Sequence, residues 1–174
     1  MSDLYDPMVR ACSFSPDGKR LAASVEFTDD ELPTIQLTQI WDLESRQLLT
    51  TFDGTDGAFT SNGESYVSLS QGKIQLRSAK GFAEIATFDK AVATESPSLT
   101  NLSLSHDGTT LVCSVRRNAI HVWNLPTRQE ITELAGHRQW IQAVAVSTDG
   151  AIVASGSADG TVRVWERYGI RRSE

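Results

Sequence analysis

Three side chains in the last third of the sequence have the types that nucleophilic catalysis uses: Ser155, His137 and Asp159. In a serine hydrolase the hydroxyl attacks, the imidazole takes its proton, and the carboxylate orients the imidazole. A hydrolase triad is therefore one interpretation of these residues. No second motif supports it, because the sequence has no Gly-x-Ser-x-Gly, no Gly-rich phosphate loop and no His-Glu-x-x-His.

Two other sets of residues have metal-ligand types, and neither has a complete ligand pattern. Asp29, Asp30 and Glu31 are consecutive, but no further ligand is indicated nearby. Cys12 and Cys113 are the two cysteines and form no Cys-x-x-Cys motif. We therefore expect no metal and no cofactor. We expect the acidic residues 29–31 to lie in a loop that is solvated or contacts a partner. Free thiols indicate a reducing compartment and hence a cytoplasmic protein.

The elements that must position the Ser, His and Asp are short strands joined by turns. Residues 141–146 form an apolar run rich in β-branched side chains, followed by the turn residues 148–150. Residues 152–155 are a second apolar run, and polar and apolar side chains alternate over residues 161–165. Asp159-Gly160 is a strong hairpin signal, because a tight hairpin turn needs positive φ at its centre. The pattern predicts an antiparallel meander.

The turn glycine of this meander recurs along the chain. Gly18, Gly63, Gly108 and Gly150 each precede an apolar run, at separations of 45, 45 and 42 residues. A period of about 40 to 45 residues is typical of four-stranded propeller blades, and several blades must stack because one cannot bury both faces. We predict a single all-β domain, residues 1–174, of about four blades. Their approximate bounds are 8–52 for blade one, 57–88 for blade two, 98–134 for blade three and 137–166 for blade four.

Residues 136–166 also resemble a WD40 repeat. Gly136-His137, the turn at 147–150 and the run 157–165 match the repeat in order, and Trp165-Glu166 stands where the repeat ends in Trp-Asp. Blade one has a true Trp-Asp pair at Trp41-Asp42. The resemblance implies WD40-type β-propeller blades. It also implies a hydrogen-bonded structural tetrad in blade four, made by His137, Ser155, Asp159 and Trp165, with Ser157 as the alternative hydroxyl.

The two middle blades depart from the repeat. In blade two Arg77 stands at the Trp position and Gln71 at the Asp position. Blade three keeps Trp123, but Cys113 and Arg117 replace the Ser and Asp of the tetrad. We therefore expect packing alone to hold blade two, and we expect it to be the least stable blade.

The resemblance also raises the question of how the blades close into a ring. The nine residues after Trp165 are short and charged, so we expect the outer strand of the last blade to be missing. Rings of this family usually have about seven blades, so the resemblance implies an incomplete or open propeller. The chain is then a fragment of a longer protein, or a homo-oligomer completes the propeller, two copies making a ring of about eight blades.

The composition and the resemblance together favour a binding protein. The net charge of −6 argues against nucleic acid, and there is neither an apolar run that spans a membrane nor a signal peptide. The resemblance implies a non-enzymatic scaffold that binds a protein or peptide through loops on one face. The alternative is the C-terminal WD40 portion, or a fragment, of a larger kinase- or protease-linked enzyme or signalling sensor. The candidate partner-binding residues, carried over by position, are Trp140, Gln142 and Ala158 in blade four, Ser98, Thr100 and Arg116 in blade three, Asp53, Thr55 and Ser70 in blade two, and Met8 and Arg10 in blade one.

Overall fold

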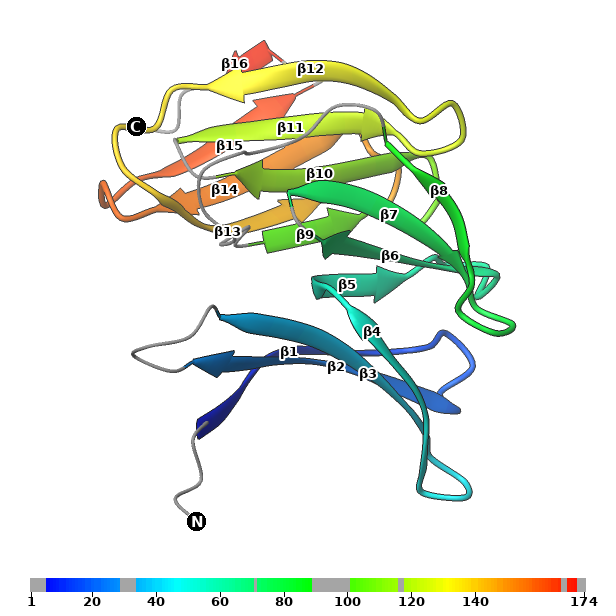
Figure 1. Cartoon of the computed structure of the whole chain (residues 1–174). Coiled ribbons are helices and arrows are strands. Elements are labelled where there is room, and N and C mark those ends of the chain that lie inside the picture. Colours follow the sequence, from blue (N-terminus) through cyan, green and yellow to red (C-terminus); the bar gives the residue numbers. More distant parts are fainter. Residues whose placement is uncertain are drawn as a thin grey trace.

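The computed structural model describes residues 6–28, 34–70, 72–88, 101–115, 118–166 and 169–171. Within these ranges sixteen strands form four antiparallel sheets of four strands each. The sheets follow one another along the chain, and each is one blade (Figure 1). The prediction of an all-β chain built from about four propeller blades is confirmed.

Each blade is a meander in which consecutive strands pair. Blade one contains β1 (Asp6–Phe14), β2 (Arg20–Thr28), β3 (Ile35–Asp42) and β4 (Gln47–Asp53). Blade two contains β5 (Thr55–Phe59), β6 (Ser65–Ser70), β7 (Lys73–Ser78) and β8 (Glu84–Thr87). Blade three contains β9 (Asn101–Leu104), β10 (Thr110–Val115), β11 (Ala119–Asn124) and β12 (Gln129–Ala135). Blade four contains β13 (Ile141–Val146), β14 (Ile152–Ser157), β15 (Val162–Glu166) and β16 (Gly169–Arg171).

The outer strand of blade four is present, which corrects the expectation that it is missing. Strand β16 has three residues and pairs with β15, with Ile170 opposite Trp165. The ladder between two strands is made by backbone N–H and C=O groups, which every residue here supplies. A short and charged segment can therefore still close the edge of the sheet.

One turn recurs with the same hydrogen bonds between the first two strands of every blade. In blade one the Ser15 hydroxyl donates to Asp17 Oδ1 at 2.6 Å and accepts the Arg20 N–H at 2.9 Å. The equivalent hydroxyls make the same two bonds at Thr60, Ser105 and Ser147. The turn glycines have φ values of 68°, 70°, 73° and 68° at Gly18, Gly63, Gly108 and Gly150. Only glycine adopts this conformation readily, which is why glycine marks the period of the sequence.

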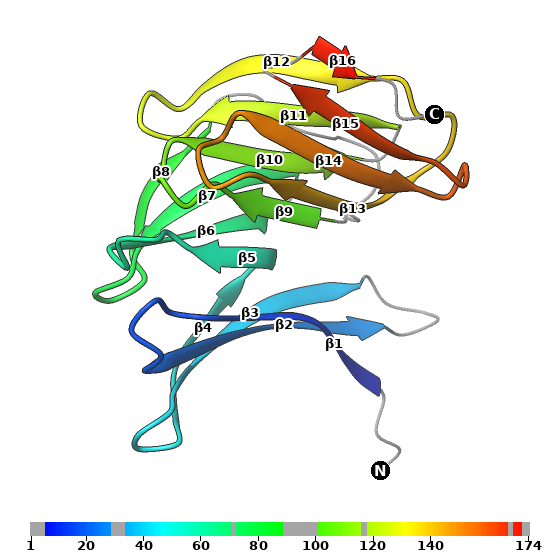
Figure 2. The ribbon, with the colours of Figure 1, turned by 180° about the vertical axis from the view of Figure 1, so that it is seen from behind.

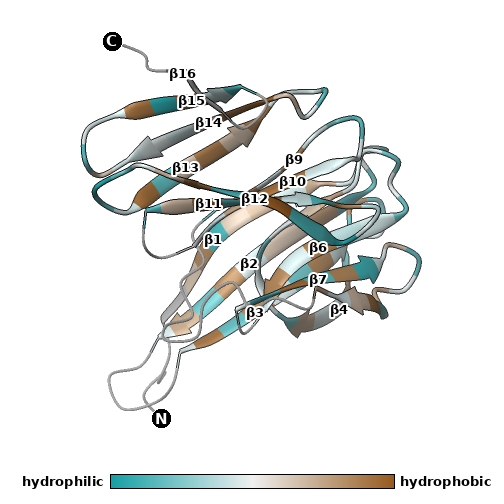
Figure 3. Cartoon of the chain, turned by 90° about the horizontal axis from the view of Figure 1, so that it is seen from above, coloured by the Kyte–Doolittle hydropathy of each residue, from teal (hydrophilic) through white to brown (hydrophobic). Residues whose placement is uncertain are grey.

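The hydrophobic core lies in the seams between blades. The cluster between blades one and two contains Ala22, Ile40, Phe59, Tyr66, Ala79 and Phe82. The cluster between blades two and three contains Val67, Leu69, Ile74, Phe88, Leu111, Cys113, Trp123 and Leu125. The cluster between blades three and four contains Val112, Ile120, Val122, Leu134, Ile141, Val153 and Trp165. Hydrophobic and hydrophilic stretches alternate along several strands (Figure 3), because successive side chains point to opposite faces of a sheet.

The blades form an open arc. Strand β1 packs against β5, β5 against β9, and β9 against β13. Within the described ranges β13 has no comparable packing against β1. Blades one and four are therefore the two ends of the arrangement (Figures 1 and 2).

Blade two is held by more than apolar packing, contrary to expectation. The Arg77 guanidinium lies over the Phe52 ring of blade one, with its carbon 4.3 Å from the ring centroid. It also donates to the Phe82 carbonyl at 3.1 Å and to Gln75 Oε1 at 2.8 Å. A cation over an aromatic face contributes about 0.5 to 2 kcal/mol. Arg77 thus replaces the tryptophan of the repeat with a cation–π contact across the seam.

Candidate partner-binding face and the hydrogen-bond network of blade four

The structure brings His137, Ser155, Asp159 and Trp165 together in one chain of hydrogen bonds. Trp165 Nε1–H donates to Ser155 Oγ at 3.1 Å, and His137 Nε2 lies 2.8 Å from the same oxygen. His137 Nδ1 lies 3.0 Å from Asp159 Oδ2. An ionised carboxylate only accepts, so Nδ1–H donates to Asp159, and in a neutral imidazole Nε2 then accepts the Ser155 proton. The chain of bonds links the loop before β13, which contains His137, to the second and third strands of the blade, which contain Ser155 and Trp165.

The arrangement is a packed network and leaves the serine no access to a substrate. Ser155 is 2% exposed, and its oxygen already accepts the Trp165 N–H. Ser157 lies outside the network, because its hydroxyl donates to the Gln139 carbonyl at 3.0 Å and accepts the Asp159 N–H at 3.2 Å. The geometry therefore favours the structural interpretation of these side chains over a hydrolase triad.

Hydrogen bonds hold the pKa of Asp159 well below its ordinary value. The Thr161 hydroxyl donates to Oδ1 at 2.6 Å and is the largest cause, followed by the Arg138 N–H, which donates to Oδ2 at 2.8 Å. The fold therefore favours the ionised form of this carboxyl. The stabilisation is present above the unfolded-state pKa and is lost as the pH falls below it.

Blade three contains the tryptophan, Trp123, but lacks the hydrogen bonds that the tetrad makes in blade four. Cys113 occupies the position of Ser155, and the buried Trp123 Nε1 has no hydrogen-bond partner in the described part of the chain. Burial raises the pKa of the Cys113 thiol to about 12, although the neighbouring Trp123 indole opposes the rise. The sulfur therefore stays a thiol and a weak acceptor. Gln71 and Arg117, which stand at the tetrad Asp positions, lie outside the described residues.

The three candidate residues of blade four form one exposed patch. The Ala158 N–H donates to the Trp140 carbonyl at 2.9 Å, and Gln142 bulges out of β13 between two paired residues. Trp140 is 70% exposed, and Gln142 and Ala158 are also exposed. We call Trp140, Gln142 and Ala158 the blade-four patch.

The candidate partner-binding residues of blades one and three differ in their surroundings from the blade-four patch. Arg10 occupies a bulge of β1 that corresponds to the Gln142 bulge, and its Nε donates to Glu26 Oε2 at 2.8 Å. A partner carboxylate would therefore compete with Glu26 for this guanidinium. Met8 is 49% exposed on the same strand. Ser98, Thr100 and Arg116 lie outside the described residues.

The prediction for blade two is wrong at two positions. Thr55 and Ser70 are each 7% exposed and cannot present their side chains to a partner, whereas Asp53 is exposed. The bulge of β5 is displaced along the strand and contains Asp56 and Gly57 instead. Sequence reasoning missed Asp56, although the Asp-Gly pair is a signal of irregular backbone. Its φ of 37° fits that signal.

Asp56 lies against the ion pair of Arg10 and Glu26 in the seam between blades one and two. The pKa of Asp56 is raised to about 6, chiefly by burial; the Arg10 charge opposes the rise and the Glu26 charge adds to it. A folded-state pKa above the unfolded-state value means that the ionised carboxyl opposes folding. This penalty is complete above pH 6 and disappears as the pH falls from about 6 to about 4.

We predict that Asp56→Asn stabilises the protein in a pH-dependent way. Asparagine has nearly the same shape and tolerates a positive φ, but it carries no charge. The free energy of unfolding should rise by about 1 to 3 kcal/mol at pH 7.5, and the gain should vanish near pH 4. Urea denaturation of both proteins at the two pH values measures this. An equal gain at both pH values would contradict the buried charge, and Asp53→Asn, at an exposed position, is the control.

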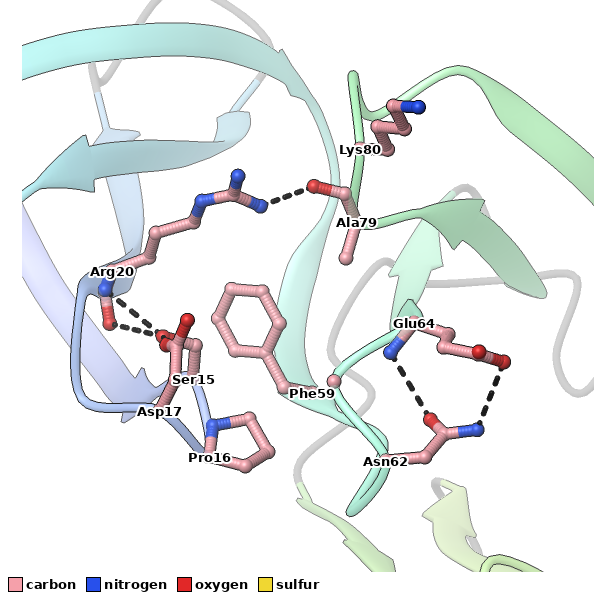
Figure 4. A pocket seen from close by; sticks show the side chains of 10 residues that line it. Ser15, Pro16, Asp17, Arg20, Phe59, Asn62, Glu64, Ala79 and Lys80 are labelled. Carbon is pink, nitrogen blue, oxygen red and sulfur yellow. Dashed lines mark hydrogen bonds between the residues drawn. The ribbon is translucent and has the colours of Figure 1, made fainter.

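A second feature of the same seam is a surface pocket of about 490 Å³ at the end of the seam where the turns lie. Phe59 points into the space between the Ser15–Asp17 turn and Ala79 (Figure 4). The Arg20 guanidinium crosses this space, donates to the Ala79 carbonyl and lies 5.6 Å from the Phe82 ring centroid. Arg20 thus ties blade one to blade two.

Metal-ligating side chains do not gather in the described ranges, where no three His, Cys, Asp or Glu are arranged to hold an ion. The same ranges contain no helix of the length and hydrophobicity that crossing a membrane requires.

Comparison with known proteins gives a consistent result. The family described as "WD domain, G-beta repeat" matches residues 128–166. The chain is 23% identical to apoptotic protease-activating factor 1 of Danio rerio over 95% of its own length and 13% of that protein. It is 28% identical to WD repeat-containing protein WDS homolog of Arabidopsis thaliana over 90% of its length and 30% of that protein. Against small ribosomal subunit protein RACK1y of Oryza sativa subsp. japonica, 57 residues are 42% identical, which is 33% of the chain and 17% of that protein.

The chain thus spans less than a third of the length of each of these relatives. The matched residues contain all of blade four except β16, including the tetrad. Four meanders with the same turn, seams between successive blades and this match lead to one conclusion. Residues 128–166 are a WD40 repeat, and the chain as a whole is built from WD40-type β-propeller blades.

Proposed function

We propose that this chain is a non-enzymatic scaffold that binds a protein or peptide through the loops at one end of its blades. The observation that carries the proposal is the blade-four patch, in which a tryptophan is 70% exposed on a hydrogen-bonded frame. Large aromatic side chains are the commonest anchors of protein interfaces. The WD40 fold itself supports protein partners in general.

The loop that presents Trp140 is held in place from three sides. The Arg138 N–H donates to Asp159 Oδ2 at 2.8 Å, and the Ser157 hydroxyl donates to the Gln139 carbonyl at 3.0 Å. The Trp140 carbonyl accepts the Ala158 N–H at 2.9 Å. Each residue of the loop is thus bonded to the hairpin at 157–159. A loop that is already ordered loses little conformational entropy on binding, so more of the contact energy appears as affinity.

The tetrad stabilises blade four and also holds the loop that presents Trp140. Asp159 bonds both the Arg138 N–H of the loop and the His137 ring of the network. The side chain of Trp140 itself is 70% exposed. Changing Trp140 should therefore alter binding without altering the fold, and changing the tetrad should alter both.

We predict that Trp140→Ala weakens partner binding by tenfold or more. A truncated anchor typically costs at least about 2 kcal/mol of binding free energy. A peptide array probed with the 174-residue chain, followed by titration of the bound peptides, measures the loss. The matched control is Ile85→Ala, since Ile85 is 50% exposed on the outer strand β8 of blade two. Equal binding by both variants would refute the proposed face.

A second candidate follows from the small share of its relatives that the chain covers. The chain can be the WD40 portion of a larger enzyme or signalling sensor, as 13% of apoptotic protease-activating factor 1 is matched. The coding sequence on either side of this chain decides between the candidates. Further in-frame repeats or a catalytic domain in the same reading frame would favour the second candidate. In either case we propose a cytoplasmic location, because Cys12 and Cys113 are both free.

A further inference from the structure

The turn between the first two strands of blade two differs from its three counterparts at one chemically important residue. An aspartate stands directly before the turn glycine in the other three turns, as Asp17, Asp107 and Asp149. Blade two has Asn62 at this position, followed by Gly63. Asn-Gly occurs once in the sequence, and the other three asparagines precede leucine or alanine. The turn of blade two therefore carries a reactive pair that the other turns lack.

An Asn-Gly pair contains both reactants of an intramolecular substitution. The glycine backbone nitrogen attacks the asparagine Cγ and forms a five-membered succinimide. The Cγ–Nδ2 bond breaks, and the amide nitrogen leaves as ammonia with the proton that the glycine nitrogen loses. Water then opens the ring at either carbonyl and leaves an aspartyl or an isoaspartyl residue. Glycine favours the attack because it has no side chain to hinder it.

The native turn holds both reacting groups in hydrogen bonds. The Gly63 N–H donates to the Thr60 carbonyl at 2.8 Å, so the attacking nitrogen is already engaged. Asn62 Oδ1 accepts the Thr60 hydroxyl at 2.7 Å and the Glu64 N–H at 3.1 Å. Asn62 Nδ2 donates to Glu64 Oε2 at 3.2 Å (Figure 4). The amide group therefore cannot turn its Cγ toward the Gly63 nitrogen until these bonds break.

Water and one of the two products are compatible with this turn. Asn62 is exposed, so solvent reaches it for the second step. Asp17 shows that an aspartyl residue fits, because its Oδ1 accepts the Ser15 hydroxyl at 2.6 Å and the Lys19 N–H at 3.0 Å. An isoaspartyl residue lengthens the backbone by one carbon atom and cannot close the same turn. The reaction thus gives one product that preserves the turn and one that disrupts it.

We propose that Asn62 is a deamidation site that the turn of blade two keeps closed. In the folded chain the reaction proceeds only through molecules in which this turn has opened, so its rate reports local opening of blade two. Asn62 lines a surface pocket at each of the two seams of blade two, and deamidation places a new carboxylate there beside Glu64. The site does not involve the blade-four patch, so it is independent of the proposed partner binding.

The reaction is measured as a gain of about 1 Da in the peptide 47–73, which trypsin releases from the chain. The unaltered chain is incubated in mildly alkaline buffer, once folded and once in guanidinium chloride. Deamidation should be at least about tenfold slower in the folded chain, because only the open fraction reacts. The peptide 91–116, which contains Asn101 before a leucine, is the internal control and should keep its mass in both states. Equal rates in the two states would overturn the protection, and no gain in guanidinium chloride would overturn the site.

Two variants test the role of the turn. Thr60→Val removes the hydroxyl that donates to Asn62 Oδ1 and accepts the Ser65 N–H at 3.1 Å. Deamidation of the folded variant should be at least about threefold faster, with the rate in guanidinium chloride unchanged. Ser147→Ala removes the equivalent hydroxyl from the turn of blade four and should change neither rate. Circular dichroism checks that both variants are folded, and a folded Thr60→Val chain that reacts no faster than the unaltered chain would overturn the proposed gating.

A third variant assigns the change in mass to one residue and needs no destabilised turn. Asn62→Asp already carries the aspartyl product, and the same residue type occupies the other three turns. It should fold as the unaltered chain does, and its peptide 47–73 should gain no further mass in guanidinium chloride. A gain of about 1 Da in this variant would place the reaction at another residue of the peptide and overturn the assignment to Asn62.

Discussion

Gly57→Ala is expected to destabilise the protein by about 3 kcal/mol, near the upper end of the range for overpacked cores. A Cβ at position 57 would lie 2.3 Å from the hydroxyl oxygen of Tyr66 and 2.4 Å from its Cζ. Tyr66 cannot move away, because it is 1% exposed and its ring centroid lies 4.9 Å from that of Phe59 and 6.0 Å from that of Phe52. The new methyl group must therefore push β5 out of the seam between blades one and two.

The effect of Gly57→Ala is measured as the free energy of unfolding in urea. The control is Gly81→Ala, because no atom lies within 4 Å of a Cβ built at Gly81. That variant should unfold within about 0.5 kcal/mol of the unaltered chain, as surface substitutions usually do. A Gly57→Ala protein as stable as the Gly81→Ala protein would show that the seam can absorb the methyl group, and the close packing argued for Tyr66 would fail.

Ser155→Ala is expected to cost about 2 to 4 kcal/mol, because it strands two buried polar groups at once. The Trp165 N–H loses its acceptor and His137 Nε2 loses its hydroxyl, both in the interior of blade four. Cys113→Ala at the equivalent position of blade three removes a larger and more apolar group, but no hydrogen bond to Trp123 is present there to break.

The comparison between these two variants separates hydrogen bonding from packing. Packing alone predicts the larger loss for Cys113→Ala, because more buried volume is removed. The network predicts the larger loss for Ser155→Ala. Thermal unfolding followed by circular dichroism ranks the two, and a smaller loss for Ser155→Ala would mean that the tetrad contributes little to stability.

The features that the sequence predicted well depend on residues close to one another in the chain. The turns at Gly18 and its three counterparts need a positive φ at one residue, and glycine marks that need directly. The tetrad is also local, because His137 and Trp165 belong to the same blade. The turn signal is repeated four times, which is why the number of blades and their order were predictable.

The features that sequence reasoning missed depend on a neighbouring blade or on the backbone. Arg77 breaks the pattern of the repeat, and the ring that compensates for it, Phe52, comes from the preceding blade. The shifted bulge at Asp56 changes which residue of β5 is buried, and no residue count reveals such a shift. Strand β16 forms through backbone pairing with β15, and the charged residues in this part of the sequence do not indicate whether such pairing occurs.

The four turns between first and second strands also bear on how the chain folds. Each turn is closed by its own hydroxyl and carboxyl or amide side chain, within six residues, as in Ser15 to Arg20. Contacts between residues so near in sequence form early, because little loop-closure entropy opposes them. The first hairpin of any blade can thus serve as a nucleus, and refolding from urea should start at several points along the chain and spread from blade to blade.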